Sequence, residues 1–147
     1  MKDFYSYGID HLNVGVSDAE RSRDFYAAAL APLGIDLTLS IPHEGCEEGG
    51  DQSRAGSAMF GFAARTNPHK PFFWVLGNVA PGQGLHVAFA AASRAQVDAF
   101  HAAALAAGGT DNGAPGVRRY HPAYYGAFVR DPDGTNVEAV CHAEAWA

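Results

Sequence analysis

The sequence predicts an α+β fold made of two tandem modules, each with the order strand, helix, strand, strand, strand (βαβββ). Three observations point to it: an internal repeat, alternating apolar segments headed by a histidine, and a helix-start signal after each segment. The chain has 147 residues, of which 48% are hydrophobic and 18% charged, enough to form one self-sufficient domain. We therefore expect a single domain over residues 1–147, with module one at about 5–78 and module two at about 83–142.

The repeat has an offset of 75 residues. Each of its two histidines opens an alternating segment that is typical of a strand, residues 9–16 in the first half and 85–90 in the second. The repeat aligns four pairs of identical residues: His11 with His86, Phe25 with Phe100, Leu30 with Leu105 and Gly34 with Gly109.

A helix is expected after each of these strands. Residues 17–20 (SDAE) and 93–96 (SRAQ) form capping boxes, in which a hydroxyl and an acid or amide satisfy the first free backbone N–H groups. Apolar residues follow near helical spacing until glycines end both helices.

Short strand-like runs complete each module. In the first half they cover residues 35–41, 57–63 and 71–76. In the second half they cover residues 124–130 and 135–141, with a weaker strand expected somewhere in 116–120. The sequence DPDG at 131–134 predicts a hairpin between the last two strands. The polar, glycine-rich stretch at 43–56 is expected to be a solvated insertion, with a lid over a cavity as the alternative.

Charge and composition exclude several classes of partner. The net charge of −6 has the wrong sign for binding nucleic acid or anionic lipid. No apolar run approaches the roughly 18 to 20 residues that span a bilayer, and the first residues do not resemble a secretory signal. We expect a cytoplasmic protein in which Cys46 and Cys141, which lack CxxC spacing, are reduced thiols.

Strand alternation places three potential metal ligands, His11, His86 and Glu138, on the faces opposite the more apolar residues. If the halves pair around a pseudo-two-fold axis, the two histidines approach each other across a shared cavity. Two imidazoles and one carboxylate leave open positions on Fe(II), Mn(II), Zn(II) or Ni(II). A single histidine is more often a structural residue, but the matching positions favour a metal site. A buried Glu138 also needs a metal or an arginine to neutralise it.

Three segments carry a resemblance to a known family: HLNVGVSDAERSRDFYAAALAPLG, LHVAFAAASRAQVDAFHAAALAAGG and YYGAFVRDPDGTNVEAV. Together they resemble the vicinal oxygen chelate superfamily, also called the glyoxalase, bleomycin resistance and extradiol dioxygenase superfamily. The resemblance implies paired βαβββ modules whose curved sheets enclose one divalent metal ion, and a homodimer. It also implies ligands on the first strand of each module and the last strand of the second, which here are His11, His86 and Glu138.

The resemblance leaves the reaction open, because each subfamily pattern lacks something here. Glyoxalase I-like isomerases add a carboxylate ligand in the last strand of module one, but residues 71–76 (PFFWVL) contain no acid. Extradiol dioxygenases place a tyrosine where Phe128 stands, although His121 and Glu138 fit their pattern. Fosfomycin-modifying members need more cationic groups than this rim offers. Bleomycin-binding members keep the fold without a metal, which the complete ligand set disfavours.

We therefore expect a divalent-metal-dependent enzyme that acts on a small organic substrate with vicinal oxygens. Three ligands without a fourth lean slightly toward extradiol dioxygenase-like chemistry. A glyoxalase I-like isomerase and a non-catalytic small-molecule binding protein remain the alternatives. The candidate acid–base residues are His121, Tyr124 and Tyr125. The candidate substrate pocket consists of Phe72, Trp74, Arg118, Tyr120 and Phe128.

Overall fold

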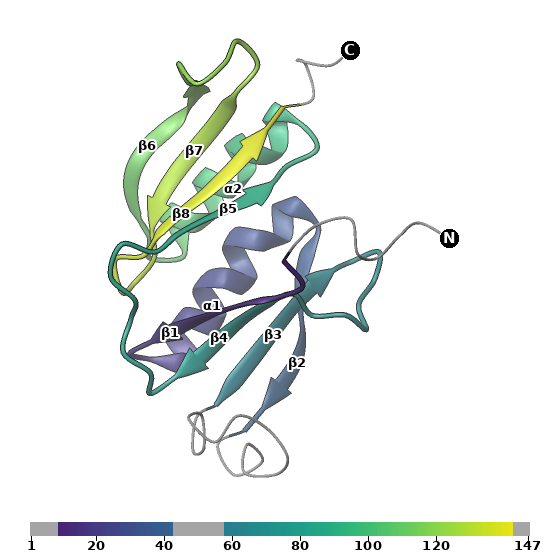
Figure 1. Ribbon diagram of the computed structural model, residues 1–147, viewed down its shortest axis with the longest axis vertical. Coiled ribbons are helices and arrows are strands. Elements are labelled where there is room, and N and C mark those ends of the chain that lie inside the picture. Colours follow the sequence, from purple (N-terminus) through teal and green to yellow (C-terminus); the bar gives the residue numbers. More distant parts are fainter. Residues whose placement is uncertain (1–8, 43–57, 143–147) are drawn as a thin grey trace.

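The computed structural model describes residues 9–42 and 58–142, and its elements follow the predicted order (Figure 1). Module one consists of β1 (Leu12–Val16), α1 (Ala19–Leu30), a short 3-10 helix η1 (Ala31–Leu33), β2 (Ile35–Ile41), β3 (Met59–Ala64) and β4 (Phe73–Gly77). Module two consists of β5 (His86–Ala90), α2 (Arg94–Ala106), β6 (Thr110–Val117), β7 (Tyr125–Arg130) and β8 (Asn136–Cys141).

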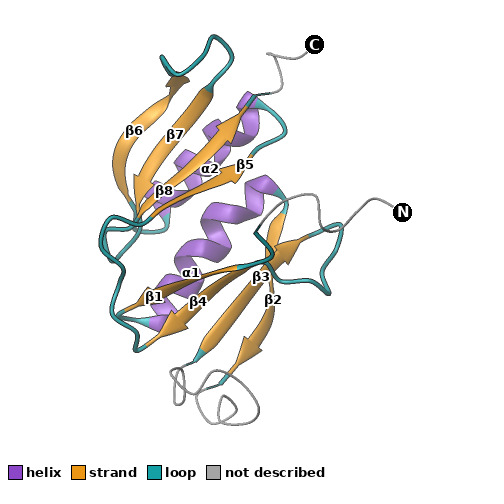
Figure 2. Ribbon diagram, in the orientation of Figure 1, coloured by secondary structure: helices purple, strands orange, loops and turns teal. Residues whose placement is uncertain are grey.

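Each module folds into its own four-stranded mixed sheet (Figure 2). The strand order is β1-β4-β3-β2 in the first sheet, called sheet A, and β5-β8-β7-β6 in the second, called sheet B. In both sheets the first and last strands of the module pair in parallel, and the other pairs are antiparallel. The prediction of an α+β fold with two βαβββ modules is confirmed. Within the described residues the two sheets remain separate and do not close around a cavity.

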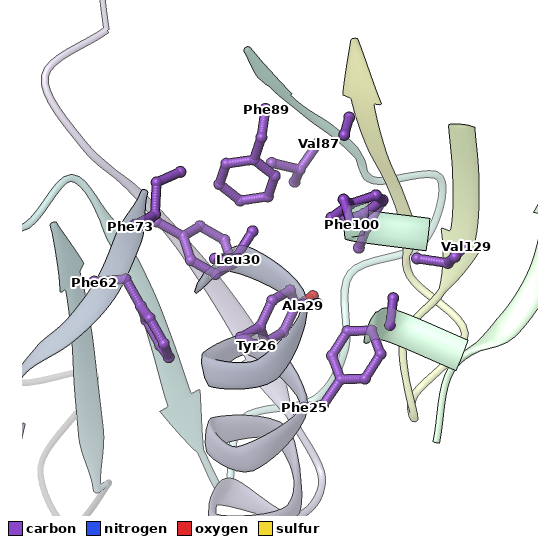
Figure 3. Packing of buried hydrophobic residues seen from close by; sticks show 14 of the residues in the cluster. Phe25, Tyr26, Ala29, Leu30, Phe62, Phe73, Val87, Phe89, Phe100 and Val129 are labelled. Carbon is purple, nitrogen blue, oxygen red and sulfur yellow. The ribbon is translucent and has the colours of Figure 1, made fainter. Parts of the chain in front are cut away.

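A single hydrophobic core joins the modules (Figure 3). The side chains of Tyr26 and Leu30 on α1 lie between the aromatic residues of sheet A and those of module two. The Phe73 ring of β4 contacts Tyr26 at 4.9 Å and Phe89 of β5 at 5.1 Å between centroids, so it bridges the modules. Helices α1 and α2 also contact each other. The core therefore fills the helix-facing sides of both sheets and leaves their opposite faces on the outside.

The predicted hairpin at residues 131–134 is confirmed, and it also fastens the two modules together. The Asp131 carboxylate is 4% exposed and accepts from the Tyr26 hydroxyl at 2.7 Å. It also accepts from the backbone N–H groups of Asp133 and Thr135, at 2.9 Å each. The Asp133 carboxylate in turn accepts from the backbone N–H of Ser17 at 3.1 Å and from its hydroxyl. The turn of module two thus holds the start of α1.

This junction corrects the predicted start of the first helix. Asp18, not Ser17, caps α1, with its side chain accepting from the Arg21 N–H at 3.0 Å. Ser17 is unavailable as a cap because its hydroxyl bonds Asp133, 116 residues away. The second helix starts as predicted, since Ser93 caps α2 and accepts from the Gln96 N–H at 3.2 Å.

The weaker strand expected within 116–120 is present but lies earlier in the chain than predicted, because β6 covers Thr110–Val117. Its sequence TDNGAPGV has low strand propensity, and its pairing with β7 is interrupted by register shifts around Gly113. The predicted insertion at 43–56, with Cys46, lies outside the described residues, whereas Cys141 is buried in the core. None of the helices in the described part of the chain is long and apolar enough to cross a membrane.

Candidate functional site

His86 and Glu138 meet on the outer face of sheet B. Strands β5 and β8 run parallel, in a register that pairs His86 with Asn136 and Ala88 with Glu138. The His86 Nε2 lies 2.9 Å from the Glu138 Oε2. The other ring nitrogen of His86, Nδ1, lies 3.3 Å from the backbone carbonyl oxygen of Asn136. The backbone of β8 therefore orients the imidazole so that Nε2 faces the carboxylate.

Glu138 is buried, although it lies on the face away from the helices. Its exposed fraction is 1%, and its Oε1 accepts from the Tyr124 hydroxyl at 2.5 Å. On the neighbouring strand, a Cβ atom at Gly126 would lie only 2.8 Å from Oε1, so glycine leaves room for the carboxylate. Among the described residues no lysine or arginine forms an ion pair with Glu138. A buried carboxylate is costly without a compensating charge, and a cation would supply it.

Tyr124 is a hydrogen-bond donor in this site. Burial and the bond to Glu138, in that order, raise the pKa of the Tyr124 phenol well above its usual value. The hydroxyl therefore stays protonated near neutral pH and donates to Glu138. The Tyr120 ring lies 4.8 Å from the Tyr124 ring, and Tyr120 itself is 74% exposed.

The other two candidate acid–base residues point elsewhere. The His121 Nε2 lies 3.0 Å from the Nδ1 of His142, and its ring contacts Tyr124 edge-on with centroids 5.5 Å apart. Tyr125 lies on the helix-facing side, where its hydroxyl donates to Asp98 of α2 at 2.7 Å. Of the three candidates, only Tyr124 contacts the Glu138 carboxylate. His121 packs against the Tyr124 ring, and Tyr125 lies on the opposite face of the sheet.

Phe128 and Arg118 extend the outer face of sheet B beside His86. Phe128 is the register partner of Glu138 on β7, and its ring stacks on that of His86 with centroids 6.0 Å apart. The Arg118 guanidinium lies 5.3 Å from the centre of the Phe128 ring. One of its terminal nitrogens donates to the carbonyl oxygens of Ala114 and Gly126, the latter at 3.1 Å. Two of the predicted pocket residues are thus adjacent to the His86–Glu138 pair.

His11 lies in module one, just before β1, and has different neighbours. Its Nδ1 lies 2.7 Å from the Oδ1 of Asp10, and the Lys70 Nζ donates to the same oxygen at 2.7 Å. The bond from Lys70, followed by that from His11, lowers the pKa of the Asp10 carboxyl. A pocket of about 370 Å³ opens beside this group over the outer face of sheet A, lined by Asp10, His11, Asn13, Met59, Lys70, Pro71 and Trp74.

The Trp74 indole lines this pocket and lies next to Gly61 of β3. A Cβ atom at Gly61, its register partner, would lie 2.8 Å from the six-membered ring, so only glycine permits this placement. Phe72, the remaining predicted pocket residue, borders a different pocket of about 350 Å³ between the modules, which His11 and His86 also line.

The structure assembles two of the three predicted ligands. His11 and His86 border one pocket, as the repeat predicts, but His11 is hydrogen-bonded to Asp10 and not to Glu138. Over the described ranges, no three His, Cys, Asp or Glu side chains surround a single point. The sequence reasoning also missed Asp10, although an acid directly before His11 was a usable signal.

The chemistry of the His86–Glu138 pair fits a divalent metal. Two ligands at about 2.0–2.2 Å from one ion, at 90–109° to each other, are separated by about 2.8–3.5 Å. The observed separation of 2.9 Å between Nε2 and Oε2 falls in that range. The pair also comes from two adjacent strands, so its geometry is held by the sheet.

A model of the Glyoxalase/Bleomycin resistance protein/Dioxygenase superfamily matches residues 8–139. The chain belongs to this superfamily. A solved glyoxalase/bleomycin resistance protein from Albidiferax ferrireducens T118 is 33% identical, with a TM-score of 0.64, over 90% of this chain and 97% of that one. No curated protein matched the chain.

Two more distant structures are similar in fold alone. A glyoxalase-related enzyme from Fulvimarina pelagi is 15% identical, with a TM-score of 0.62, over 90% of this chain and 86% of that one. A V278E mutant of glyoxalase I from Zea mays is 20% identical, with a TM-score of 0.58, over 90% of this chain and 43% of that one.

Proposed function

We propose that this superfamily member is a divalent-metal-dependent enzyme that binds the two vicinal oxygens of a small organic substrate. The observation that carries the proposal is the nearly fully buried Glu138 carboxylate with the His86 Nε2 at 2.9 Å. Iron, manganese, zinc and nickel all accept two imidazoles and one carboxylate as ligands. When bound, such an ion acts as a Lewis acid on the substrate oxygens.

We further propose that the third ligand is His11 of the partner subunit in a homodimer. The shared core occupies the helix-facing sides of both sheets, so the faces with His86 and with Trp74 both lie outside. A two-fold axis that sets sheet A of one subunit against sheet B of the other would complete two equivalent sites. Each site would then hold His86 and Glu138 from one subunit and His11 of the partner subunit.

The chain's own residues would divide the remaining work. Tyr124, neutral because its pKa is raised, keeps the unliganded oxygen of Glu138 hydrogen-bonded and so orients the carboxylate. Phe128 and Trp74 offer ring faces to the substrate, and Arg118 supplies positive charge beside Phe128. His121 remains the candidate for moving protons between the site and solvent.

The outer face of sheet A favours three-ligand chemistry. In β4, Trp74 and Leu76 are the residues that alternate away from the core, and neither is a carboxylate. A glyoxalase I-like isomerase would need an acid there, so we favour dioxygenase-like chemistry over isomerisation.

The metal content of purified protein tests the proposal. We expect about one metal ion per chain in the wild type, and loss of that metal in Glu138→Ala and His86→Ala. His101→Ala is the matched control. His101 lies on α2 and bonds Asp111 at 2.9 Å, and it touches neither the His86–Glu138 pair nor His11. Wild-type protein that takes up no metal after reconstitution would contradict the enzyme and favour a metal-free binding protein.

A further inference from the structure

The Asp10 carboxylate lies between the Lys70 ammonium group and His11, the candidate metal ligand of module one. Its Oδ1 is 2.7 Å from the Nδ1 of His11 and 2.7 Å from the Nζ of Lys70. Lys70 precedes β4 and Asp10 precedes β1, two strands that pair in parallel. The contact is therefore made by two segments that the sheet holds side by side.

The hydrogen bond to Asp10 determines which nitrogen of His11 can bind a metal. An ionised carboxylate only accepts hydrogen bonds, so the Nδ1 of His11 must carry the proton. In a neutral imidazole the lone pair then lies on Nε2. Lys70 holds the carboxylate in place, so the ring has a fixed orientation as well as a fixed tautomer.

Module two orients its histidine with a different group. The Nδ1 of His86 faces the backbone carbonyl of Asn136 at 3.3 Å, which leaves its Nε2 toward Glu138. His11 stands one residue before β1, and a side chain takes the orienting role there. Nε2 is thus the ring nitrogen of His86 that faces the proposed metal position, and without a metal it donates to Glu138.

We propose that Asp10, held by Lys70, is a positioning residue that fixes His11 with its Nε2 free for the metal. A carboxylate or carbonyl behind a metal-binding imidazole raises its basicity and orients it, and its loss typically lowers metal affinity 10- to 100-fold. The functional role of the Lys70–Asp10–His11 contacts rests on the proposed metal site, but the orientation of His11 by Asp10 can be tested without metal.

The first test is the tautomer of His11 in metal-free protein, read from the ¹⁵N NMR signals of the two imidazole nitrogens. We expect His11 to carry its proton on Nδ1 in the wild type. Asp10→Ala should give a mixture of tautomers, while Asp10→Asn, which keeps an acceptor, should retain the wild-type form. The His86 signal should be the same in all three proteins.

The second test is metal affinity, measured by competition with a chelator. Asp10→Ala should bind metal 10- to 100-fold more weakly, and Lys70→Met should show a smaller loss. Asp24→Ala is the control: Asp24 is 69% exposed against 66% for Asp10 and pairs with Arg23 at 2.7 Å, but it lies on α1. We expect its affinity to match the wild type.

Three results would overturn the inference. The first is an unchanged His11 tautomer in Asp10→Ala, and the second is an unchanged metal affinity in that variant. The third is equal loss of affinity in Asp10→Ala and Asp10→Asn without any change of tautomer, which would assign the effect to charge alone. A wild type that binds no metal would refute the proposed function, while the tautomer would still decide whether Asp10 orients His11.

Discussion

The two modules share a topology but differ at the positions that matter for chemistry. The repeat that aligns His11 with His86 also aligns Asn13 with Ala88. Asn13 pairs with Trp74 in β4, just as Ala88 pairs with Glu138 in β8. Trp74 therefore occupies in module one the place that Glu138 occupies in module two.

The neighbouring strands differ in the same way. Gly61 lies opposite Trp74 and leaves space for the indole, whereas the large Phe128 lies opposite Glu138. Large and small side chains have exchanged places between the modules. Both modules have thus kept the histidine and the scaffold, but the acid beside it differs: Glu138 on the adjacent strand in module two, and Asp10 directly before the histidine in module one.

The largest expected effect comes from making the modules alike. Trp74→Glu places an acid at the position equivalent to Glu138, over the space that Gly61 leaves. The new carboxylate would be an additional metal ligand. Groups that only hydrogen-bond a ligand already change metal affinity about 10-fold or more, so we expect the affinity to rise by roughly 10-fold or more. Chelator competition measures it, with Trp74→Gln as the uncharged control. Equal affinity in the two variants would contradict the equivalence of the two positions.

A second prediction concerns the junction between the modules. Tyr26→Phe removes the buried hydrogen bond to Asp131 and should lower the free energy of unfolding by about 1.5–3 kcal/mol, since the acceptor is charged. Tyr125→Phe removes a bond of the same length, 2.7 Å, at an exposed site, and should change it by about 0.5 kcal/mol or less. Urea denaturation compares the two variants. Similar losses would show that burial at this junction does not matter.

The smallest expected effect is on pH dependence. Burial, followed by the charge of Asp131, raises the pKa of Tyr26 well above its ordinary 10.0. The stabilisation is complete below pH 10 and falls above it, because the unfolded chain loses the phenol proton while the folded chain keeps it. Urea midpoints at about pH 8 and pH 11 should therefore differ less in Tyr26→Phe than in the wild type. An equal difference in both proteins would refute this role of Tyr26.

Strand alternation and the repeat were sufficient to predict which face carries His86 and Glu138, because both signals are local. Alternation could also have separated Tyr124 from Tyr125, since adjacent residues on a strand point to opposite faces. The start of α1 could not be predicted, because Ser17 bonds a carboxylate 116 residues away. The position of His11 relative to Glu138 could not be predicted from the sequence either, because it depends on how the two modules pack.

The central claim is that each metal site combines His11 of one subunit with His86 and Glu138 of the other, and mixed dimers test it most directly. Neither His11→Ala nor Glu138→Ala alone should bind metal. After the two variants are unfolded together and refolded, half of the dimers should be mixed, and each mixed dimer should hold one intact site of two. The account predicts recovery of about a quarter of the wild-type metal content. No recovery, with mixed dimers demonstrated by native mass spectrometry, would contradict it and place all three ligands within one chain.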